Sequence, residues 1–154
     1  MITEAVERLR RGLGFPGMVV LQFGFGSGDP ANVHTPSNHP EDTVVYTGTH
    51  DNDTVFSWYS GLDEAVRAEV DDAIDTAGVR EREPYWSLIR LAHASPARVA
   101  MVQMQDVLGL GSEARMNTPG RASGAWKWQL DRLPAAALAR RLRSATEAAG
   151  RARS

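Results

Sequence analysis

The fold of this chain is decided by the stretch TVVYTGTHDNDT, which covers residues 43–54. Its first five residues, 43–47, are mostly β-branched or aromatic and predict a short strand. Four polar side chains follow at positions 50–53, and a helical pattern begins after them. Parallel α/β folds carry their chemistry at the carboxyl ends of strands. The stretch therefore predicts a strand, a polar loop suited to binding or catalysis, and a helix.

The rest of the chain alternates between helical and extended patterns. Apolar spacing predicts helices within residues 2–13, 54–59, 66–77, 85–92 and 138–149, and strands at residues 18–23, 43–47 and 99–104. Helical segments separate most of the strands, which favours parallel pairing with right-handed crossovers. Three strands leave sheet edges unpaired, a liability that complete folds avoid. The pattern is therefore typical of an α/β protein that is a slice of a larger barrel, built as a single unit.

Composition excludes several classes of protein. The 154 residues suffice for one domain, and the formal net charge of -2 creates no field that favours nucleic acid or an anionic membrane. Cysteine is absent, which removes disulfides and thiolate metal sites and suits a reducing cytoplasm. No apolar run approaches the roughly 20 residues of a membrane span, and the first residues lack the pattern of a signal peptide. We therefore expect a cytoplasmic protein without a nucleic-acid or membrane partner.

The polar loop after the central strand has two interpretations. Asn52 or Asp53 can cap the following helix, and Asp51 can form an Asx-turn. Alternatively, His50 and Asp51 can bind a neutral polyol, because a carboxylate accepts hydroxyl hydrogens and an imidazole can donate or accept. The residues alone leave both interpretations open.

A metal site in this loop is the weaker interpretation. A hydrolase built on His50, Asp51 and Asp53 would need about three ligands in a suitable arrangement. His34 and His39 lie nearby in the sequence, but no His-x-x-x-His or similar spacing occurs. We therefore expect no metal.

The glycines at positions 24, 26 and 28 invite a phosphate-loop interpretation that fails in detail. The dinucleotide fingerprint would need its third glycine at position 29, where the chain has Asp29. An acidic residue in the loop also opposes phosphate. We expect these glycines to allow a sharp turn at the end of a strand.

Further candidates follow the third strand. By itself the run NTPG, residues 117–120, is simply a turn. Asp106 is either a second site carboxylate or one half of a buried pair with an arginine such as Arg115. Trp126 and Trp128 alternate, so in an extended segment they would face opposite ways. Sugar sites use aromatic faces, but packing is the commoner role of tryptophan.

Taken together, these segments resemble the C-terminal part of the 4-α-glucanotransferases, the amylomaltase or disproportionating-enzyme family. The matching runs are long, ordered and correctly spaced, and they cover nearly the whole chain. They are FPGM (15–18), VLQF (20–23), VVYTGTHDNDT (44–54), QDVLGLGSEARMNTPG (105–120) and ASGAWKW (122–128).

The resemblance implies a (β/α)₈ TIM barrel with its active site at the C-terminal face. It implies retaining transfer of α-1,4-glucan segments between maltooligosaccharides, by two displacements that use a carboxylate nucleophile and an acid/base. Asp51 corresponds to the family's third carboxylate, which stabilises the transition state. His50 corresponds to a substrate-binding histidine, and Asn117 to a wall of the donor site. No cofactor is implied.

The chain departs from the family in what it lacks. The resemblance puts the nucleophilic aspartate and the acid/base glutamate upstream, and Glu4 falls on the helix after the acid/base strand, so it is not that glutamate. We therefore expect residues 1–154 to be a C-terminal fragment of the catalytic barrel domain, inactive in isolation and partnered by the missing N-terminal part of the barrel. The alternative is a non-catalytic carbohydrate-binding or complementing fragment.

Overall fold

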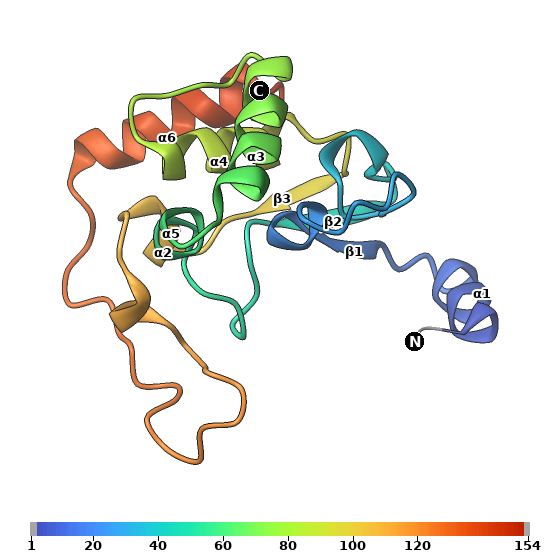
Figure 1. Ribbon diagram of the computed structural model, residues 1–154, viewed down its shortest axis with the longest axis horizontal. Coiled ribbons are helices and arrows are strands. Elements are labelled where there is room, and N and C mark those ends of the chain that lie inside the picture. The colour runs from blue at the N-terminus through green and yellow to red at the C-terminus, as the bar shows by residue number, and fades with distance from the viewer. Residues whose placement is uncertain (1–2, 153–154) are drawn as a thin grey trace.

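The structure of the chain is a computed structural model that describes residues 3–152 (Figure 1). Its elements, with 3₁₀ helices labelled η, are α1 (Glu4–Gly12), β1 (Gly17–Val20), η1 (Leu21–Gly24), η2 (Pro36–Asn38), β2 (Thr43–Tyr46), α2 (Val55–Ser60), α3 (Glu64–Thr76), α4 (Pro84–Ala94), β3 (Val99–Met101), α5 (Met104–Val107), η3 (Ser112–Ala114) and α6 (Ala136–Ala148). The five predicted helices correspond to α1, α2, α3, α4 and α6, and each is confirmed.

The strands form one parallel sheet in the order β1-β2-β3. Val19 of β1 pairs with Val45 of β2, and Val45 pairs with Ala100 of β3. The predicted parallel pairing is confirmed. Because all three strands run in the same direction, their carboxyl ends meet at one edge, which is where the candidate residues are expected.

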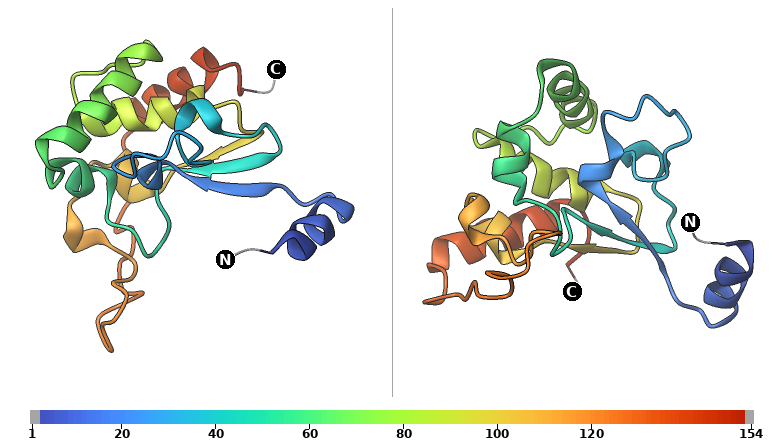
Figure 2. Two further views of the ribbon diagram at one scale, coloured as in Figure 1. Left: turned by 45° about the vertical axis from the view of Figure 1, so that its right-hand side comes forward. Right: turned by 60° about the horizontal axis from the view of Figure 1, so that its bottom comes forward.

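Helices cover one face of this sheet. Helices α3, α4 and α6 lie on the same side of it in Figure 1 and in the left view of Figure 2. Val19 and Val45 point to that side and are buried against Ile74 of α3 and against Leu88 and Leu91 of α4. Complete burial of an aliphatic side chain contributes about 1.5–3 kcal/mol, so this layer is the main source of stability in the described chain.

The opposite face of the sheet is open. Strand alternation directs Met18, Val99 and Met101 to that side, and their exposed fractions are 58%, 40% and 49%. Parallel sheets are ordinarily covered on both faces, because their crossover helices pack there. Residues 3–152 thus leave an apolar surface that belongs to a larger assembly of strands.

Helix α1 projects away from the rest of the molecule (Figure 1). The Thr3 hydroxyl caps it by accepting a hydrogen bond from Val6 N at 3.5 Å. None of its residues is buried, and Val6 and Leu9 are exposed. Ile2, which the sequence pattern also assigned to this apolar stripe, lies outside the described residues.

Two predicted strands end earlier than expected. The strand predicted over 18–23 stops at Val20, and a 3₁₀ turn follows. Gly24, at the end of this turn, lies so close to the next part of the loop that a Cβ there would be 2.3 Å from the carbonyl oxygen of His34, so glycine is required. The strand predicted over 99–104 ends at Met101 and gives way to α5, which was not predicted. A short apolar run does not distinguish a strand from a buried helical turn.

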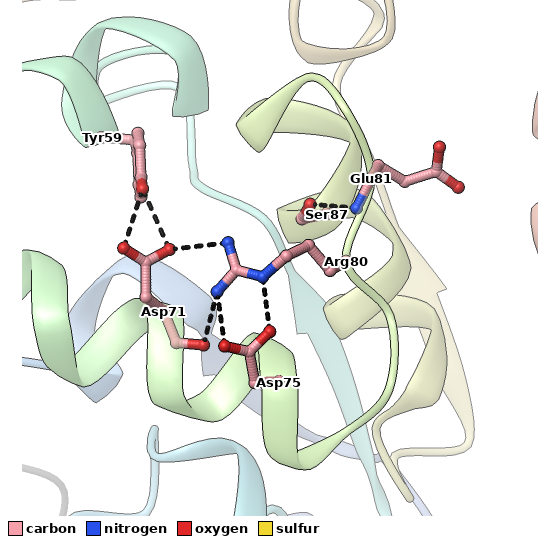
Figure 3. Close-up of polar contacts among 6 residues, drawn as sticks. All are labelled: Tyr59, Asp71, Asp75, Arg80, Glu81 and Ser87. Carbon is pink, nitrogen blue, oxygen red and sulfur yellow. Dashed lines mark hydrogen bonds and ion pairs between the residues drawn. The ribbon is translucent and has the colours of Figure 1, made fainter.

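An ion-pair network ties the outer helices together (Figure 3). Arg80 donates to Asp71 at 3.2 Å and also to Asp75, and the Tyr59 hydroxyl donates to Asp71 at 3.0 Å. The hydrogen bond from Arg80 lowers the pKa of Asp75, and the same bond raises the pKa of Arg80. The network links α2 and α3 to the segment that leads into α4. Its charged side chains are partly exposed, and solvent screens the attraction between them.

The described helices are short. No helix within residues 3–152 has the length and apolar character that crossing a membrane requires.

Candidate functional site

The site lies where the β2–α2 loop meets the segments after β1 and β3. Gln22, just past β1, donates its side-chain amide to the carbonyl of Asp53 at 2.8 Å. Gln103, just past β3, donates to the carbonyl of Thr49 at 3.0 Å. Two side-chain amides therefore hold the polar loop from both sides, at the carboxyl edge of the sheet.

Asn52 and Gly48 set the shape of this loop. The Asn52 side-chain oxygen accepts from Thr49 N at 2.9 Å and from the Thr49 hydroxyl at 2.8 Å. A Cβ on Gly48 would lie 2.7 Å from the Gln22 amide nitrogen, so a side chain there would displace the amide that holds the loop. Asn52 is thus an internal brace, which leaves the two residues before it facing outward.

The predicted capping role of Asn52 or Asp53 is wrong. The cap of α2 is Thr54, whose hydroxyl accepts from Ser57 N at 3.3 Å. Asp53 accepts from Thr54 N at 2.8 Å and, through its other oxygen, from the Ser112 hydroxyl at 2.7 Å. The cap therefore falls one residue later than the pattern indicated, and Asp53 instead contacts Ser112 of η3.

The structure brings together the three residues predicted to form the site. Asn117 Nδ2 donates to Asp51 Oδ1 at 2.5 Å, and His50 Nε2 lies 3.4 Å from the same oxygen. The backbone N–H of Asn117 also donates to the carbonyl of His50 at 3.0 Å. The side chains of His50 and Asp51 are 52% and 47% exposed, so a ligand can reach both. The Asx-turn, which was one of the two interpretations of Asp51, is not formed, because this side chain contacts Asn117 instead.

Arg115 is the residue that fastens the two loops together, and the sequence assigned it to the wrong carboxylate. Its guanidinium donates to the carbonyl of Asp51 at 3.0 Å and to that of Asn117 at 3.3 Å, and it lies 3.4 Å from a carboxylate oxygen of Asp53. The expected partner, Asp106, is elsewhere. The only sequence signal for this role was an arginine two residues before Asn117.

Asp106 is a buried structural group. It is completely buried and accepts from the Thr47 hydroxyl at 2.6 Å and from Val55 N at 2.9 Å. Burial raises the pKa of its carboxyl. Asp106 therefore joins β2, α2 and α5 behind the site, and it does not face a ligand.

A hollow of about 990 Å³ adjoins His50 and Asp51 and continues over the open face of the sheet. Tyr46, Met101 and the half-buried Trp128 are among the residues that line it. Its volume lies at the upper end of the range for small-molecule sites. An apolar wall with a few polar groups at one end suits a ligand that has both hydroxyls and ring faces.

No metal arrangement is found in the described part of the chain. Residues 3–152 contain no group of three or more histidines, cysteines or acidic residues placed to hold an ion. His34 Nδ1 accepts from Val20 N at 3.1 Å, and His39 bonds the Ser95 hydroxyl at 2.7 Å. Burial lowers the pKa of both imidazoles. These two histidines fasten the loop between η1 and β2 to the fold.

The glycine loop has no phosphate-binding geometry. The N–H of Gly26 donates to a carboxylate oxygen of Glu69 at 2.8 Å. Gly26 and Gly28 have φ angles of 75° and 63°, which glycine adopts at no steric cost. A backbone donor already paired with a carboxylate leaves no cradle for an anion, and the glycines serve the turn.

Comparison with known proteins identifies relatives of one kind. A family model described as 4-alpha-glucanotransferase matches residues 1–134. The 4-alpha-glucanotransferase of Thermus thermophilus is 47% identical over 135 residues, which are 84% of this chain and 27% of the relative. The chloroplastic/amyloplastic 4-alpha-glucanotransferase DPE1 of Arabidopsis thaliana is 47% identical over 130 residues, 84% of this chain and 22% of the relative. The cytoplasmic location expected from the sequence stays a prediction beside this chloroplastic relative.

A solved structure agrees with these matches. Amylomaltase from Streptococcus agalactiae, in complex with acarbose, superposes with a TM-score of 0.86 and 28% identity over 99% of this chain and 31% of that chain. The chain thus spans about a quarter of the length of its curated relatives. The predicted fold, one part of a TIM barrel, is confirmed. In such a barrel the helices lie outside, so the open face of this sheet corresponds to the side that faces the interior of a complete barrel.

Proposed function

The chain belongs to the 4-alpha-glucanotransferase family, and we propose that it forms the C-terminal part of a catalytic barrel that transfers α-1,4-glucan segments between maltooligosaccharides. In this proposal residues 1–154 are a single unit of the barrel domain. The partner is the remaining N-terminal part of the barrel, and the substrate is a maltooligosaccharide or α-1,4-glucan. One observation carries the proposal: an exposed carboxylate, Asp51, is held by Asn117 and lies beside His50 at the carboxyl edge of the sheet.

The hydrogen bonds of Asp51 suit a carboxylate that acts on a sugar. Asn117 and His50 both approach Oδ1, and the hydrogen bonds formed within residues 3–152 leave Oδ2 free. A free carboxylate oxygen can accept hydrogen bonds from ring hydroxyls, and its negative charge favours an oxocarbenium-like transition state. His50, beside it, can donate to or accept from a further hydroxyl. We assign Asp51 as the transition-state stabiliser and His50 and Asn117 as substrate-binding residues.

The proposal places the other two catalytic carboxylates outside this chain. A retaining transfer needs a nucleophile and an acid/base. Glu4 does not supply either one, because it lies on the projecting helix α1 and pairs with Arg8 at 2.7 Å. We therefore expect the 154-residue chain alone to give no turnover of maltotriose, and a ladder of longer oligomers from the purified chain would contradict this.

The test of Asp51 is a pair of substitutions on either side of the same strand, β2, made in a barrel completed with the upstream part. Asp51→Asn keeps the shape and the contact with Asn117 but removes the charge. Loss of one preorganised electrostatic group typically lowers kcat by about 100- to 1,000-fold. The measurement is disproportionation of maltotriose, followed as glucose release.

Asp42→Asn is the matched control. Asp42 precedes β2 at the opposite edge of the sheet and is 50% exposed, about as much as Asp51. We expect this variant to keep full activity. An Asp51→Asn enzyme as active as the Asp42→Asn enzyme would show that the assigned role is wrong.

The second candidate is a non-catalytic fragment that binds carbohydrate or complements another chain. The observation that favours it is the hollow beside His50 and Asp51, which residues of this chain line by themselves. Titration of the isolated chain with acarbose separates the candidates. Saturable binding, combined with no activity after the upstream part is supplied, would favour the non-catalytic fragment.

A further inference from the structure

Trp126 has an unusual backbone for its type. Its φ of 60° makes it the only residue other than glycine with a positive φ within residues 3–152. Bulky side chains rarely adopt this region, and they persist there only where the surroundings hold them. A glycine with φ of 93° lies two residues earlier, at Gly124, so the chain places its large aromatic residue at a position that would suit glycine better.

Burial does not explain this conformation. Trp126 is 61% exposed and belongs to neither hydrophobic cluster of the described chain. It also does not line the hollow, which Trp128 does. The contact it does make is with the site: its indole ring lies against the imidazole of His50, with ring centroids 5.0 Å apart and an interplanar angle of 37°.

The base of the same loop is closed onto the site. The N–H of Trp126 donates to the carbonyl of Met116 at 2.5 Å, directly before Asn117. The segment between Met116 and Trp126 is therefore a closed loop, which is the long loop after η3 in Figure 2. At one end Asn117 contacts Asp51, and at the other end Trp126 contacts His50. This closure determines where the indole ring lies.

His50 has little else to orient its ring. Its imidazole is half exposed, and its polar contact within the described residues is the 3.4 Å approach of Nε2 to Asp51 Oδ1. A contact that long constrains rotation weakly. The indole ring lies against the imidazole, and aromatic pairs in tilted geometry at this distance are favourable.

We propose that Trp126 is a positioning residue, held in a left-handed backbone conformation so that its indole ring orients the His50 imidazole beside Asp51. One consequence of this role rests on the proposed function: Trp126 affects sugar binding only through His50. It differs from the role of Trp128, which lines the hollow directly.

The first test is geometric and needs no ligand. In NMR spectra of the folded 154-residue chain, we expect cross-relaxation between the indole protons of Trp126 and the ring protons of His50. We also expect the ring current of the indole to shift the His50 resonances, and Trp126→Ala to return them toward those of an unstacked imidazole. Trp126→Phe should keep part of the shift, and Trp128→Ala should keep all of it. Absence of the cross-relaxation in the folded wild-type chain overturns the proposal, whether or not any variant folds.

The second test asks whether Trp126 acts through His50. Acarbose affinity of the chain is measured by calorimetry for Trp126→Ala, His50→Ala and the double variant. Loss of one aromatic pair corresponds to an affinity about two- to tenfold weaker. We expect Trp126→Ala to cause that loss in the wild-type background and none in the His50→Ala background. Trp128→Ala should weaken binding equally in both.

The outcomes separate this inference from the proposed function. A wild-type chain that shows the indole–imidazole contact but binds no acarbose, even when completed with the upstream part, contradicts the proposed function and leaves the positioning of His50 intact. A wild-type chain that binds acarbose, with additive effects of Trp126→Ala and His50→Ala, contradicts the inference.

A further variant, Trp126→Gly, separates the effect of the ring from that of the backbone. We expect it to bind acarbose like Trp126→Ala although its backbone strain is relieved. Wild-type affinity in this variant would contradict the role of the ring.

Discussion

The two faces of the sheet carry alternate residues of the same strands and yet differ in almost every physical respect. On one face Val19 and Val45 are completely buried beneath α3 and α4. On the other, Met18 and Met101 are about half exposed and border the hollow that holds the site. The helix-covered face is complete with what lies within residues 3–152, whereas the open face needs further strands. The difference shows that this part of the family's barrel includes the helices that cover its own strands, but only some of the strands whose side chains would fill the barrel interior.

The comparison is tested most strongly by removing one large side chain from each face. Leu88→Ala empties a completely buried position on α4, and such truncations cost about 2–5 kcal/mol. Met101→Ala on the open face should cost far less in the isolated chain, because half of that side chain is already in water. Urea unfolding of both variants measures the difference. Equal losses would mean that the open face is covered in solution, for example by a second copy of the chain.

A second substitution tests whether the two loops of the site are held in place by the hydrogen bonds of Arg115. Arg115→Ala removes the donor that links Asp51, Asn117 and Asp53, and hydrogen bonds from a charged, partly buried donor contribute about 1.5–3 kcal/mol. We expect faster hydrogen exchange in the loops around positions 51 and 117 and an unchanged helical layer. Arg121→Ala, on the exposed part of the same loop, is the control and should leave exchange as in the wild type. Faster exchange throughout the helices as well would contradict the prediction that Arg115 stabilises only the loops of the site.

The smallest expected effect is a change in the free energy of unfolding with pH, caused by two buried histidines. Burial lowers the pKa of His39 and His93, so the folded state binds fewer protons than the unfolded state below the ordinary value of 6.5. Stability is therefore fully present above about pH 6.5 and falls as the pH drops through the folded pKa of each imidazole. The slope for each group is at most about 1.4 kcal/mol per pH unit. Urea unfolding at a series of pH values should show a shallower slope for His39→Gln; an identical slope would show that His39 is not buried as a neutral group.

The site illustrates why some of its members were predictable and others were not. His50 and Asp51 are adjacent and follow a recognisable strand, so their position at the carboxyl edge could be read from the sequence. The partner of Arg115 could not, because Asp106 and Asp53 are both plausible ion-pair partners until the fold places one of them inside the core. The strained backbone of Trp126 had no sequence signal, since nothing in the run ASGAWKW marks a left-handed conformation.

Sequence by itself determined the five longer helices, the parallel sheet, the family and the identity of the polar residues after β2, because these depend on periodicity and on motifs that act over a few neighbouring positions. Tertiary structure alone decided where β1 and β3 end, which carboxylate is buried, and that Asn117 contacts Asp51 across 66 positions of the chain. The physical reason is that local propensities are weak and do not distinguish between the alternative ends of a strand or the alternative partners of a charge. The contact between two distant loops depends on how the whole sheet and its helices pack.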